Sequence, residues 1–252
     1  MEINLSQKIV LVTGASRGIG EAISRALARS GATVAVHFNR QRQKAEQLAE
    51  ELGNDAQVFQ ADLGHPAECT SLMTKVLERY RKLDVLVNNA GIYLEARVDQ
   101  SPAKWLEIWD QTIAVNLTAS AILSQLAIQH FLARDGGKII NISSRAAFRG
   151  DTPHHLAYAA SKGGMVSLTR SIARGLGKHG IVAFLVAPGF VRTDMAEEYF
   201  QEHGDQQVMA EIALSRLTEP DDLAPLVVML ASGLADHATG CTIDINAASY
   251  VR

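Results

Sequence analysis

Short apolar runs alternate with longer amphipathic segments along the whole chain, and no other feature constrains the fold as strongly. Most of these runs are rich in β-branched residues, which is typical of strands buried on both faces of a parallel sheet. The predicted strands are Ile9–Thr13, Thr33–Phe38, Gln57–Gln60, Val85–Asn88, Lys138–Ile142, Ile181–Val186 and Thr242–Ile245.

The segments between these runs have the pattern of helices. In Ile19–Arg29, one apolar stripe runs through Ile23 and Leu27, while Arg25 lies on the polar side. Strands that alternate with helices of such lengths form βαβ units with right-handed crossovers. The sequence therefore predicts an α/β fold, a Rossmann-type doubly wound parallel sheet of about seven strands with helices on both faces.

The unbroken rhythm of the 252 residues predicts a single domain, which spans residues 1–252. We find no internal repeat, low-complexity tract or Pro/Gly/Ser-rich linker in the sequence. Residues 193–216 depart from the rhythm because they are mostly polar and only weakly amphipathic. We expect this segment to be a substrate lid over a cleft, and a simple surface excursion is the alternative.

Charge and cysteine content exclude several classes of function. The formal net charge of −3 disfavours nucleic acid and anionic membranes as partners, because both attract basic surfaces. Cys69 and Cys241 have no CxxC partner, so we expect two buried thiols in a reducing compartment rather than a disulfide. Neither a secretory signal nor a long uninterrupted apolar stretch is found, which predicts a soluble, cytoplasmic protein without a membrane partner.

A glycine-rich loop follows the first predicted strand and leads directly into a helix. Glycines at this place let the backbone turn sharply and approach a pyrophosphate, while free N–H groups at the helix start face the phosphates. A glycine-rich turn without a ligand is the alternative. The predicted dinucleotide loop consists of Gly14, Ser16, Arg17, Gly18, Ile19 and Gly20.

The residues after the second predicted strand favour NADP(H) over NAD(H). An NAD enzyme places a carboxylate about 20 residues after the loop, whereas this chain has Asn39 and Arg40. Arg40 and Arg17 could offer paired donors to a 2′-phosphate, although Arg40 could also simply begin the polar face of the next helix. Asp62 and its neighbour Leu63 could meet the adenine, but an isolated Asp is as often a helix N-cap.

Tyr158 and Lys162 lie four residues apart in a predicted helix, so both side chains lie on one helix face. A nearby cation lowers the pKa of a tyrosine, which suits Tyr158 to general acid/base catalysis. Ser144 lies at the end of the fifth predicted strand, where ligands bind in such sheets, and its hydroxyl could hold a substrate carbonyl. Ser143 is the alternative donor.

These motifs, read together, resemble those of one known family. Their order is typical of short-chain dehydrogenases/reductases, and the resemblance covers essentially the whole chain. The stretch from Ala187 to Met195 is most similar to the 3-oxoacyl-acyl-carrier-protein reductases. The motifs that carry the resemblance are Gly14–Gly20, Asn88–Gly91, Asn116, Ser144, Tyr158 with Lys162, and Pro188 with Gly189.

The resemblance implies a role for each matched residue. Tyr158 would protonate a carbonyl oxygen as hydride arrives from the nicotinamide, and Ser144 would orient that carbonyl. Lys162 would hold the nicotinamide ribose and lower the pKa of Tyr158, and Asn116 would position a water that links Lys162 to solvent. Further cofactor contacts are implied for Asn89, Ala90, Gly91, Pro188, Gly189, Val191 and Thr193.

The resemblance also implies an NADP(H)-dependent reductase of a ketone, such as a 3-oxoacyl thioester, that forms a homotetramer through the helices containing Asn116 and Tyr158. The alternatives are an NAD(P)-dependent dehydrogenase of a secondary alcohol, sugar or steroid, and a dinucleotide-binding sensor without catalysis. Lys178 stands where acyl-carrier-protein reductases usually have an arginine, so docking of a carrier protein is left open.

The loop before Tyr158 departs from the family pattern. Tyr158 lies fourteen residues after Ser144, one more than expected, and the loop contains the adjacent His154 and His155. Adjacent histidines rarely converge on one metal ion, and no carboxylate or cysteine cluster accompanies them. We therefore expect both histidines on the loop surface and predict no metal site.

Overall fold

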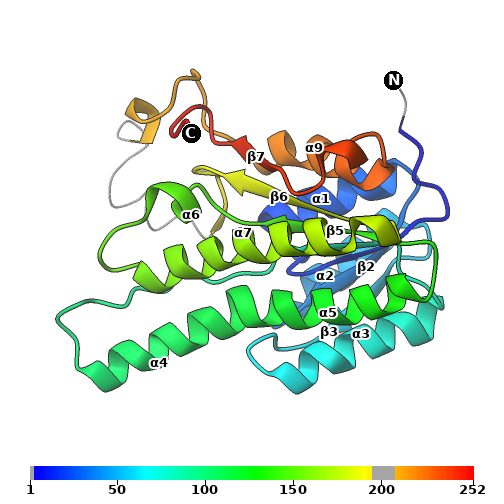
Figure 1. Ribbon diagram of the computed structural model, residues 1–252, viewed down its shortest axis with the longest axis horizontal. Coiled ribbons are helices and arrows are strands. Elements are labelled where there is room, and N and C mark those ends of the chain that lie inside the picture. The colour runs from blue at the N-terminus through cyan, green and yellow to red at the C-terminus, as the bar shows by residue number, and fades with distance from the viewer. Residues whose placement is uncertain (1–2, 195–207) are drawn as a thin grey trace.

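The computed structural model describes residues 3–194 and 208–252 (Figure 1). Its strands form a parallel seven-stranded sheet in the order β3-β2-β1-β4-β5-β6-β7, which confirms the predicted Rossmann-type doubly wound fold. The strands are β1 (Ile9–Val12), β2 (Thr33–Phe38), β3 (Gln57–Gln60), β4 (Val85–Asn88), β5 (Gly137–Ile142), β6 (Ile181–Pro188) and β7 (Thr242–Ile245).

Helices cover both faces of the sheet (Figure 1). One face carries α1 (Gly18–Arg29), α2 (Arg42–Leu52) and α9 (Pro220–Ser232). The opposite face carries α3 (Pro66–Tyr80), α5 (Ala119–Leu132) and α7 (Leu156–Leu176). The remaining helices are α4 (Pro102–Ile113), which leads into α5, and the single turn α6 (Ala146–Arg149) after β5.

Alternate residues of the central strands divide the core into two layers. Val10 and Val12 of β1 pack with α1 and α9, whereas Leu11 between them packs with α3 and α5. Val12 pairs with Val36 of β2 on one side and Val87 of β4 on the other. The strand order reverses between β1 and β4, and in such sheets ligands bind beyond the carboxyl ends of the strands at this point.

Two expectations about burial were wrong. Gln57 and Gln60 of β3 are exposed, because β3 lies at the edge of the sheet and has a neighbouring strand on one side only. Both cysteines are free thiols, as predicted, but Cys69 alone is buried while Cys241 is partly exposed. Strand limits were predicted closely; β6 continues to Pro188 because that residue still pairs with β7.

Among the described residues, one continuous helical segment, Pro102–Leu132, is long and apolar enough to cross a membrane by length and composition alone. It consists of α4, a π-helical stretch at Ala114–Thr118, and α5. Leu123 and Phe131 of α5 are completely buried in the core, and core helices of other proteins pass the same test. The absence of a membrane partner stays a prediction.

Candidate active site

The predicted catalytic side chains come together beyond the carboxyl ends of β4 and β5. Ser144 lies just after β5, while Tyr158 and Lys162 lie in the first turns of α7. The Ser144 hydroxyl is hydrogen-bonded to the Tyr158 side chain. The Lys162 Nζ atom lies 5.7 Å from the centroid of the Tyr158 ring. Two separate elements therefore place a hydroxyl, a phenol and an ammonium side by side.

The Lys162 ammonium is buried, with 3% of the residue exposed. Its Nζ atom donates a hydrogen bond to the Ile142 carbonyl at the end of β5, at 2.9 Å. Burial lowers the pKa of Lys162 to about 8. A Cβ atom at Gly91 would lie 3.5 Å from Nζ, so this glycine leaves the space next to the ammonium open.

The pKa of Tyr158 differs from the expectation for a tyrosine beside a cation. Burial raises this pKa to about 12, and the hydrogen bond with Ser144 acts in the opposite direction. Burial disfavours the charged phenolate, and the nearby Asp151 carboxylate also raises this pKa, while the Lys162 ammonium donates its hydrogen bond to the Ile142 carbonyl. Tyr158 is therefore protonated at neutral pH, the form that can give a proton to a carbonyl oxygen.

The two adjacent serines have different partners. The Ser143 hydroxyl is buried and donates to the Lys162 carbonyl at 3.0 Å, which fastens α7 to the end of β5. The Ser144 hydroxyl accepts the Ala146 N–H at 3.1 Å and is bonded to Tyr158. The Ser143 hydroxyl proton is therefore already used within the protein, and the choice of Ser144 over Ser143 as the substrate-binding serine stays a prediction.

Asn116 lies in the π-helical stretch Ala114–Thr118, a local widening of the helix that the sequence pattern does not indicate. Its amide is buried and clamps Ile92 from both sides. Oδ1 accepts the Ile92 N–H at 2.8 Å, and Nδ2 donates to the Ile92 carbonyl at 3.0 Å. Nδ2 also donates to the Ser161 hydroxyl at 3.1 Å. Widened turns of this kind frequently occur at functional sites.

The glycine loop has the backbone shape that a pyrophosphate requires. Gly14 and Gly18 have φ angles of +63° and +55°, in the left-handed region that favours glycine. A Cβ atom at Gly20 would lie 2.3 Å from the Gly14 carbonyl oxygen. Because α1 begins at Gly18, its first N–H groups have no partner within the helix and are suited to an anion.

The turn after β4 is tied to this loop. The Thr13 hydroxyl accepts the N–H groups of Asn89 and Ala90 at 2.9 and 3.0 Å. The Asn89 side-chain amide donates to the carbonyls of Thr13 and Gly14 at 2.8 and 3.2 Å. Asn89 and Ala90 therefore fix the loop through hydrogen bonds, and the next residue, Gly91, lies beside the Lys162 ammonium.

The segment after β6 lies across the same loop. A Cβ atom at Gly18 would lie 3.3 Å from the Thr193 methyl group. The Arg17 guanidinium pairs with Asp194 at 3.1 Å, with both side chains exposed. Val191, two residues before Thr193, is buried and pairs with Thr218.

Pro188 and Gly189 join this segment to its neighbours. The Pro188 carbonyl accepts the Arg145 N–H at 2.8 Å, and Gly189 lies so close to Asn246 that a Cβ atom would meet it at 2.8 Å. Gly189 directly follows β6, and Asn246, against which it packs, directly follows β7. Residues 195–207 of the predicted lid lie outside the described residues, so the lid stays a prediction.

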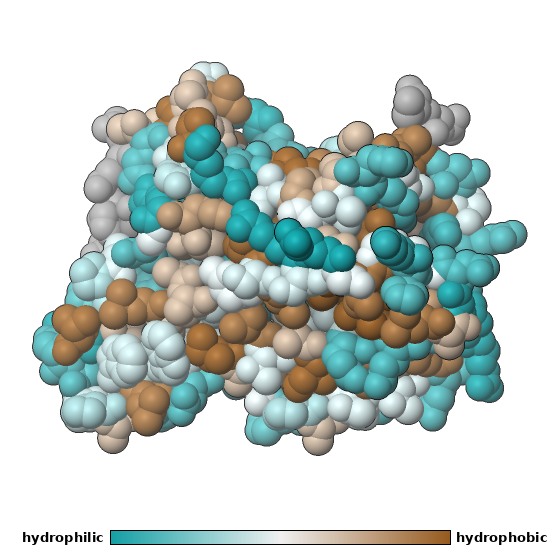
Figure 2. Space-filling view, viewed as in Figure 1, coloured by the Kyte–Doolittle hydropathy of each residue, from teal (hydrophilic) through white to brown (hydrophobic). Residues whose placement is uncertain are grey.

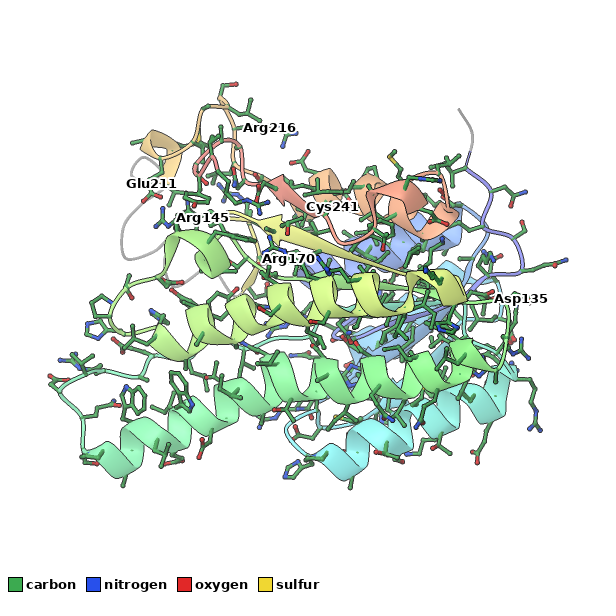
Figure 3. All side chains as sticks on the ribbon, in the orientation of Figure 1. Asp135, Arg145, Arg170, Glu211, Arg216 and Cys241 are labelled. Carbon is green, nitrogen blue, oxygen red and sulfur yellow. The ribbon has the colours of Figure 1, made fainter. Side chains whose placement is uncertain are left out.

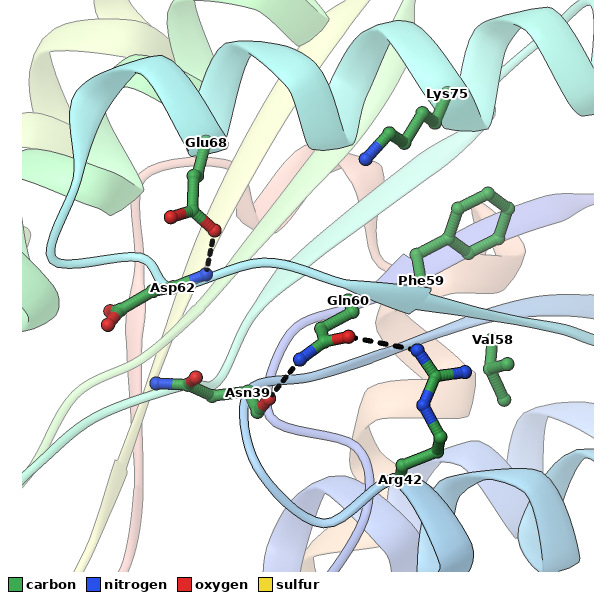
Figure 4. A pocket seen from close by; sticks show the side chains of 8 residues that line it. All are labelled: Asn39, Arg42, Val58, Phe59, Gln60, Asp62, Glu68 and Lys75. Carbon is green, nitrogen blue, oxygen red and sulfur yellow. Dashed lines mark hydrogen bonds between the residues drawn. The ribbon is translucent and has the colours of Figure 1, made fainter.

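The predicted adenosine contacts lie at the ends of β2 and β3. Asn39 and Arg40 are exposed. The Asp62 carboxylate accepts the Gly64 N–H at 2.9 Å in a local turn, and it is not the N-cap of α3, which is His65. Leu63 is buried, so its side chain contributes to the core. Beside β3, an open pocket of about 580 Å³ is lined by Asn39, Arg42, Val58, Phe59, Gln60, Asp62, Glu68 and Lys75 (Figure 4).

An aromatic cluster next to Tyr158 was missed by sequence reasoning. The rings of Tyr93 and His155 stack in parallel with centroids 3.8 Å apart, and the Tyr93 ring meets that of Tyr158 at right angles at 4.7 Å. The Tyr93 hydroxyl donates to Asp151 at 3.1 Å. His155 is therefore partly buried beside the site, and His154 is partly buried as well, so the expectation that both lie on the loop surface was wrong. Among residues 3–194 and 208–252, no cluster that could hold a metal ion occurs.

Arg145, which directly follows Ser144, is another residue near the site that no sequence pattern indicated. Its guanidinium is buried, pairs with Glu211 at 3.0 Å and lies over the Phe190 ring at 4.2 Å (Figure 3). This contact joins the turn after β5 to the described end of the predicted lid. A buried arginine has no periodicity that would distinguish it from a surface arginine, so the sequence pattern could not find it.

Comparison with known proteins places the chain in a family. The family model described as short chain dehydrogenase matches residues 8–204. The chain belongs to the short-chain dehydrogenase family. It is 37% identical over 247 residues to the 3-oxoacyl-[acyl-carrier-protein] reductase FabG of Staphylococcus aureus strain Mu50, covering 97% of this chain and 98% of that protein. The resemblance inferred from the motifs is thereby confirmed.

Solved structures show the same relationship. A dehydrogenase/reductase from Sinorhizobium meliloti 1021 superposes with a TM-score of 0.90 at 34% identity, covering 99% of this chain and 98% of that one. A short chain dehydrogenase from Burkholderia cenocepacia J2315, solved in complex with NADP, superposes with a TM-score of 0.88 at 34% identity, covering 98% and 99% of the two chains. This short-chain dehydrogenase is accordingly an oxidoreductase.

Proposed function

We propose that this enzyme uses NADPH to reduce a ketone, with 3-oxoacyl thioesters as its substrate class. The convergence of Ser144, Tyr158 and Lys162 next to the glycine loop carries the proposal. The name of the Staphylococcus aureus relative supports the thioester, and the NADP complex of the Burkholderia cenocepacia relative supports the cofactor. The positive φ angles of Gly14 and Gly18 let the loop approach a dinucleotide pyrophosphate closely. The first N–H groups of α1, which have no partner within the helix, can bind its oxygens.

The described residues divide the chemistry between them. A bound NADPH would supply hydride to the carbonyl carbon. Ser144 donates a hydrogen bond to the carbonyl oxygen and orients it, and Tyr158 gives its hydroxyl proton to that oxygen as negative charge develops there. The Lys162 ammonium stabilises the resulting phenolate, and Asn116 holds the Ile92 backbone beside it. The products are the secondary alcohol and NADP⁺, and the Tyr158 phenolate then takes up a proton from solvent to restore the phenol.

We propose that different residues bind each part of the cofactor, from the adenine to the nicotinamide. The loop from Gly14 to Gly20 would bind the pyrophosphate, Arg17 and Arg40 the 2′-phosphate, and Asp62 the adenine. At the nicotinamide end, Lys162 would bind the ribose. The further contacts proposed there are Asn89, Ala90, Gly91, Pro188, Gly189, Val191 and Thr193.

A kinetic panel tests the substrate class. 3-Oxoacyl thioesters on a small thiol, on the carrier protein, and simple cyclic ketones would each be offered with NADPH. We expect the highest kcat/KM with a thioester, and a preference for the carrier-bound form would add the carrier protein as a partner. Turnover of cyclic ketones alone would contradict the thioester assignment.

Removal of the Arg40 guanidinium should weaken the binding of NADPH but not that of NADH. In Arg40→Ala, we expect the KM for NADPH to rise roughly tenfold or more, because a charged hydrogen bond to phosphate contributes about 1.5–3 kcal/mol. The KM for NADH should not change. Arg79→Ala is the matched control, since its guanidinium pairs with Asp55 near the end of α3, and its removal should leave both values unaltered. A wild-type enzyme with a lower KM for NADH than for NADPH would refute the assignment.

The pH dependence of kcat/KM for ketone reduction should follow the titration of the Lys162 ammonium. Its pKa in the folded protein, about 8, is lower than the usual 10.5, so the ammonium is present near pH 7 and is lost as pH rises through 8. We expect kcat/KM for the ketone to decline above about pH 8, since this ratio reports the free enzyme. Any residual activity of Lys162→Arg should lack the decline, because a guanidinium stays charged. A profile for the wild type that stays flat to alkaline pH would contradict this role.

We further propose a homotetramer that acts in the cytoplasm as a single domain over residues 1–252. Helices α4 and α7 present partly exposed apolar surface (Figure 2), including Leu106 at 50% and Leu156 at 44% exposure. The rings of Trp105 and Trp109, both in α4, stack with their centroids 5.1 Å apart. The free thiols of Cys69 and Cys241 suit a reducing compartment. A monomer in light scattering would contradict the assembly.

A further inference from the structure

His37 is a buried titratable residue at the carboxyl end of β2 that has no part in the chemistry described above. Only 1% of the residue is exposed, and both ring nitrogens have backbone partners. Nε2 lies 3.1 Å from the Ala61 carbonyl oxygen, and Nδ1 lies 3.0 Å from the Gly14 nitrogen. A carbonyl can only accept, so Nε2 carries the proton and Nδ1 accepts the Gly14 N–H. These partners define one neutral tautomer.

The contact with Gly14 acts on the first turn of the glycine loop. His37 also accepts the Ala15 N–H through its own carbonyl, at 2.9 Å. His37 therefore accepts the first two N–H groups of the loop, and the N–H groups left for a ligand run from Ser16 to the start of α1. The Gly14 carbonyl is held from the opposite side by Asn89, at 3.2 Å. The peptide groups on both sides of Gly14 are thus bonded while its φ is +63°.

The contact with Ala61 extends this connection to β3. Ala61 directly precedes Asp62, and its own N–H donates to the Phe38 carbonyl at 3.1 Å. His37 therefore joins the three segments that are proposed to meet the cofactor: the glycine loop, the residues after β2 and the residues after β3. Burial lowers the pKa of His37 to about 4, although the hydrogen bond with the Ala61 carbonyl and the nearby Asp62 carboxylate act in the opposite direction. The imidazole is accordingly neutral at physiological pH, as its two hydrogen bonds require.

We propose that His37 is a positioning residue for the dinucleotide, which holds the Gly14 peptide in the orientation that the pyrophosphate needs. The inference rests on the proposed function only in taking a nicotinamide dinucleotide as the ligand. NADPH and NADH share the pyrophosphate, so both should depend on His37, whereas Arg40 should affect NADPH alone. His37 touches no reacting atom, and its effect should appear in cofactor affinity rather than in the chemical step.

The matched control is His130, whose Nε2 accepts the Leu83 N–H at 3.1 Å. Leu83 precedes β4 and thus lies at the amino ends of the strands, whereas the glycine loop lies at their carboxyl ends. His130→Phe should lower the melting temperature through the same kind of lost bond, without altering the Kd of either nucleotide. This comparison separates a positioning role of His37 from a contribution to stability alone.

The test measures the Kd of NADPH and of NADH by titration, with kcat at saturating NADPH and the melting temperature. His37→Phe should raise both Kd values roughly tenfold or more, since it leaves the Gly14 N–H without its acceptor. In His37→Asn the amide oxygen branches from the same carbon as Nδ1, so it should recover most of the affinity. In His37→Gln the amide can reach Ala61 but not Gly14, and affinity should stay low. All variants should retain kcat.

Three results would overturn the inference: an unchanged Kd in His37→Phe, no recovery in His37→Asn, or an equal loss of affinity in His130→Phe. A wild-type preference for NADH would overturn the proposed cofactor instead. Even then, a loss of NADH affinity in His37→Phe that His37→Asn restores would support the positioning role.

Discussion

Tyr158→Phe is expected to lower kcat for ketone reduction by about 10³-fold, within the range that general acid catalysis contributes. The substitution removes the only proton that Tyr158 can give to the carbonyl oxygen and leaves the ring in place. Because the ring still packs against Tyr93, the site should keep its shape. The Kd of NADPH should stay within about threefold of the wild-type value, a difference of under 1 kcal/mol.

Stopped-flow reduction and NADPH titration would measure the two effects separately. Tyr80→Phe is the matched control, since the Tyr80 hydroxyl bonds to the Asp55 carbonyl at 2.9 Å, far from the site at the end of α3. It should retain full turnover. If Tyr158→Phe turned over normally, another group would have to supply the proton, and the assigned acid would be wrong.

Gly20→Ala is expected to disrupt the dinucleotide loop, because the added methyl group would lie 2.3 Å from the Gly14 carbonyl oxygen and 2.6 Å from the Asn89 amide. Neither neighbour can move without breaking the contacts that shape the loop. We expect the free energy of unfolding to fall by about 3 kcal/mol, as for other overpacked sites. NADPH should bind roughly 100-fold more weakly, a loss of about 2.7 kcal/mol.

Gly175→Ala is the matched control for this helical glycine. A Cβ atom at Gly175, in α7, would meet nothing within 4 Å. The substitution should stabilise the protein by about 0.5–1 kcal/mol, because alanine has the higher helix propensity, and should leave NADPH binding unchanged. Chemical denaturation and nucleotide titration would check both variants. Equal affinity for NADPH in Gly20→Ala and the wild type would show that the loop tolerates the methyl group.

The positions of the strands could be predicted because each depends on a local run of apolar residues. β2, β3, β4 and β7 occupy the predicted ranges, and the limits of the others differ only at their ends. The ends depend on pairing: β6 continues to Pro188 because Ile245 of β7 lies beside it. The exposure of Gln57 and Gln60 could not be predicted locally, because it follows from the place of β3 at the edge of the sheet.

The contacts around the site depended on residues far apart in the chain. Tyr93 and His155 stack although 62 positions separate them in the sequence, and Arg145 meets Glu211 from a different element. Neither pair has a motif or a periodicity, so no pattern in the sequence indicates it. The π-helical turn at Asn116 likewise contains a side chain whose partners, Ile92 and Ser161, lie far away in the sequence.

The proposed acid/base pair, Tyr158 and Lys162, depends partly on local sequence and partly on tertiary structure. The spacing of Tyr158 and Lys162 determined by itself that both would lie on one helix face, since helix geometry is local. Only the tertiary structure decided their protonation, because burial of both groups depends on β5 and the segment after β4. Desolvation raises the pKa of Tyr158 and lowers that of Lys162, so the phenol keeps the proton it needs for reduction.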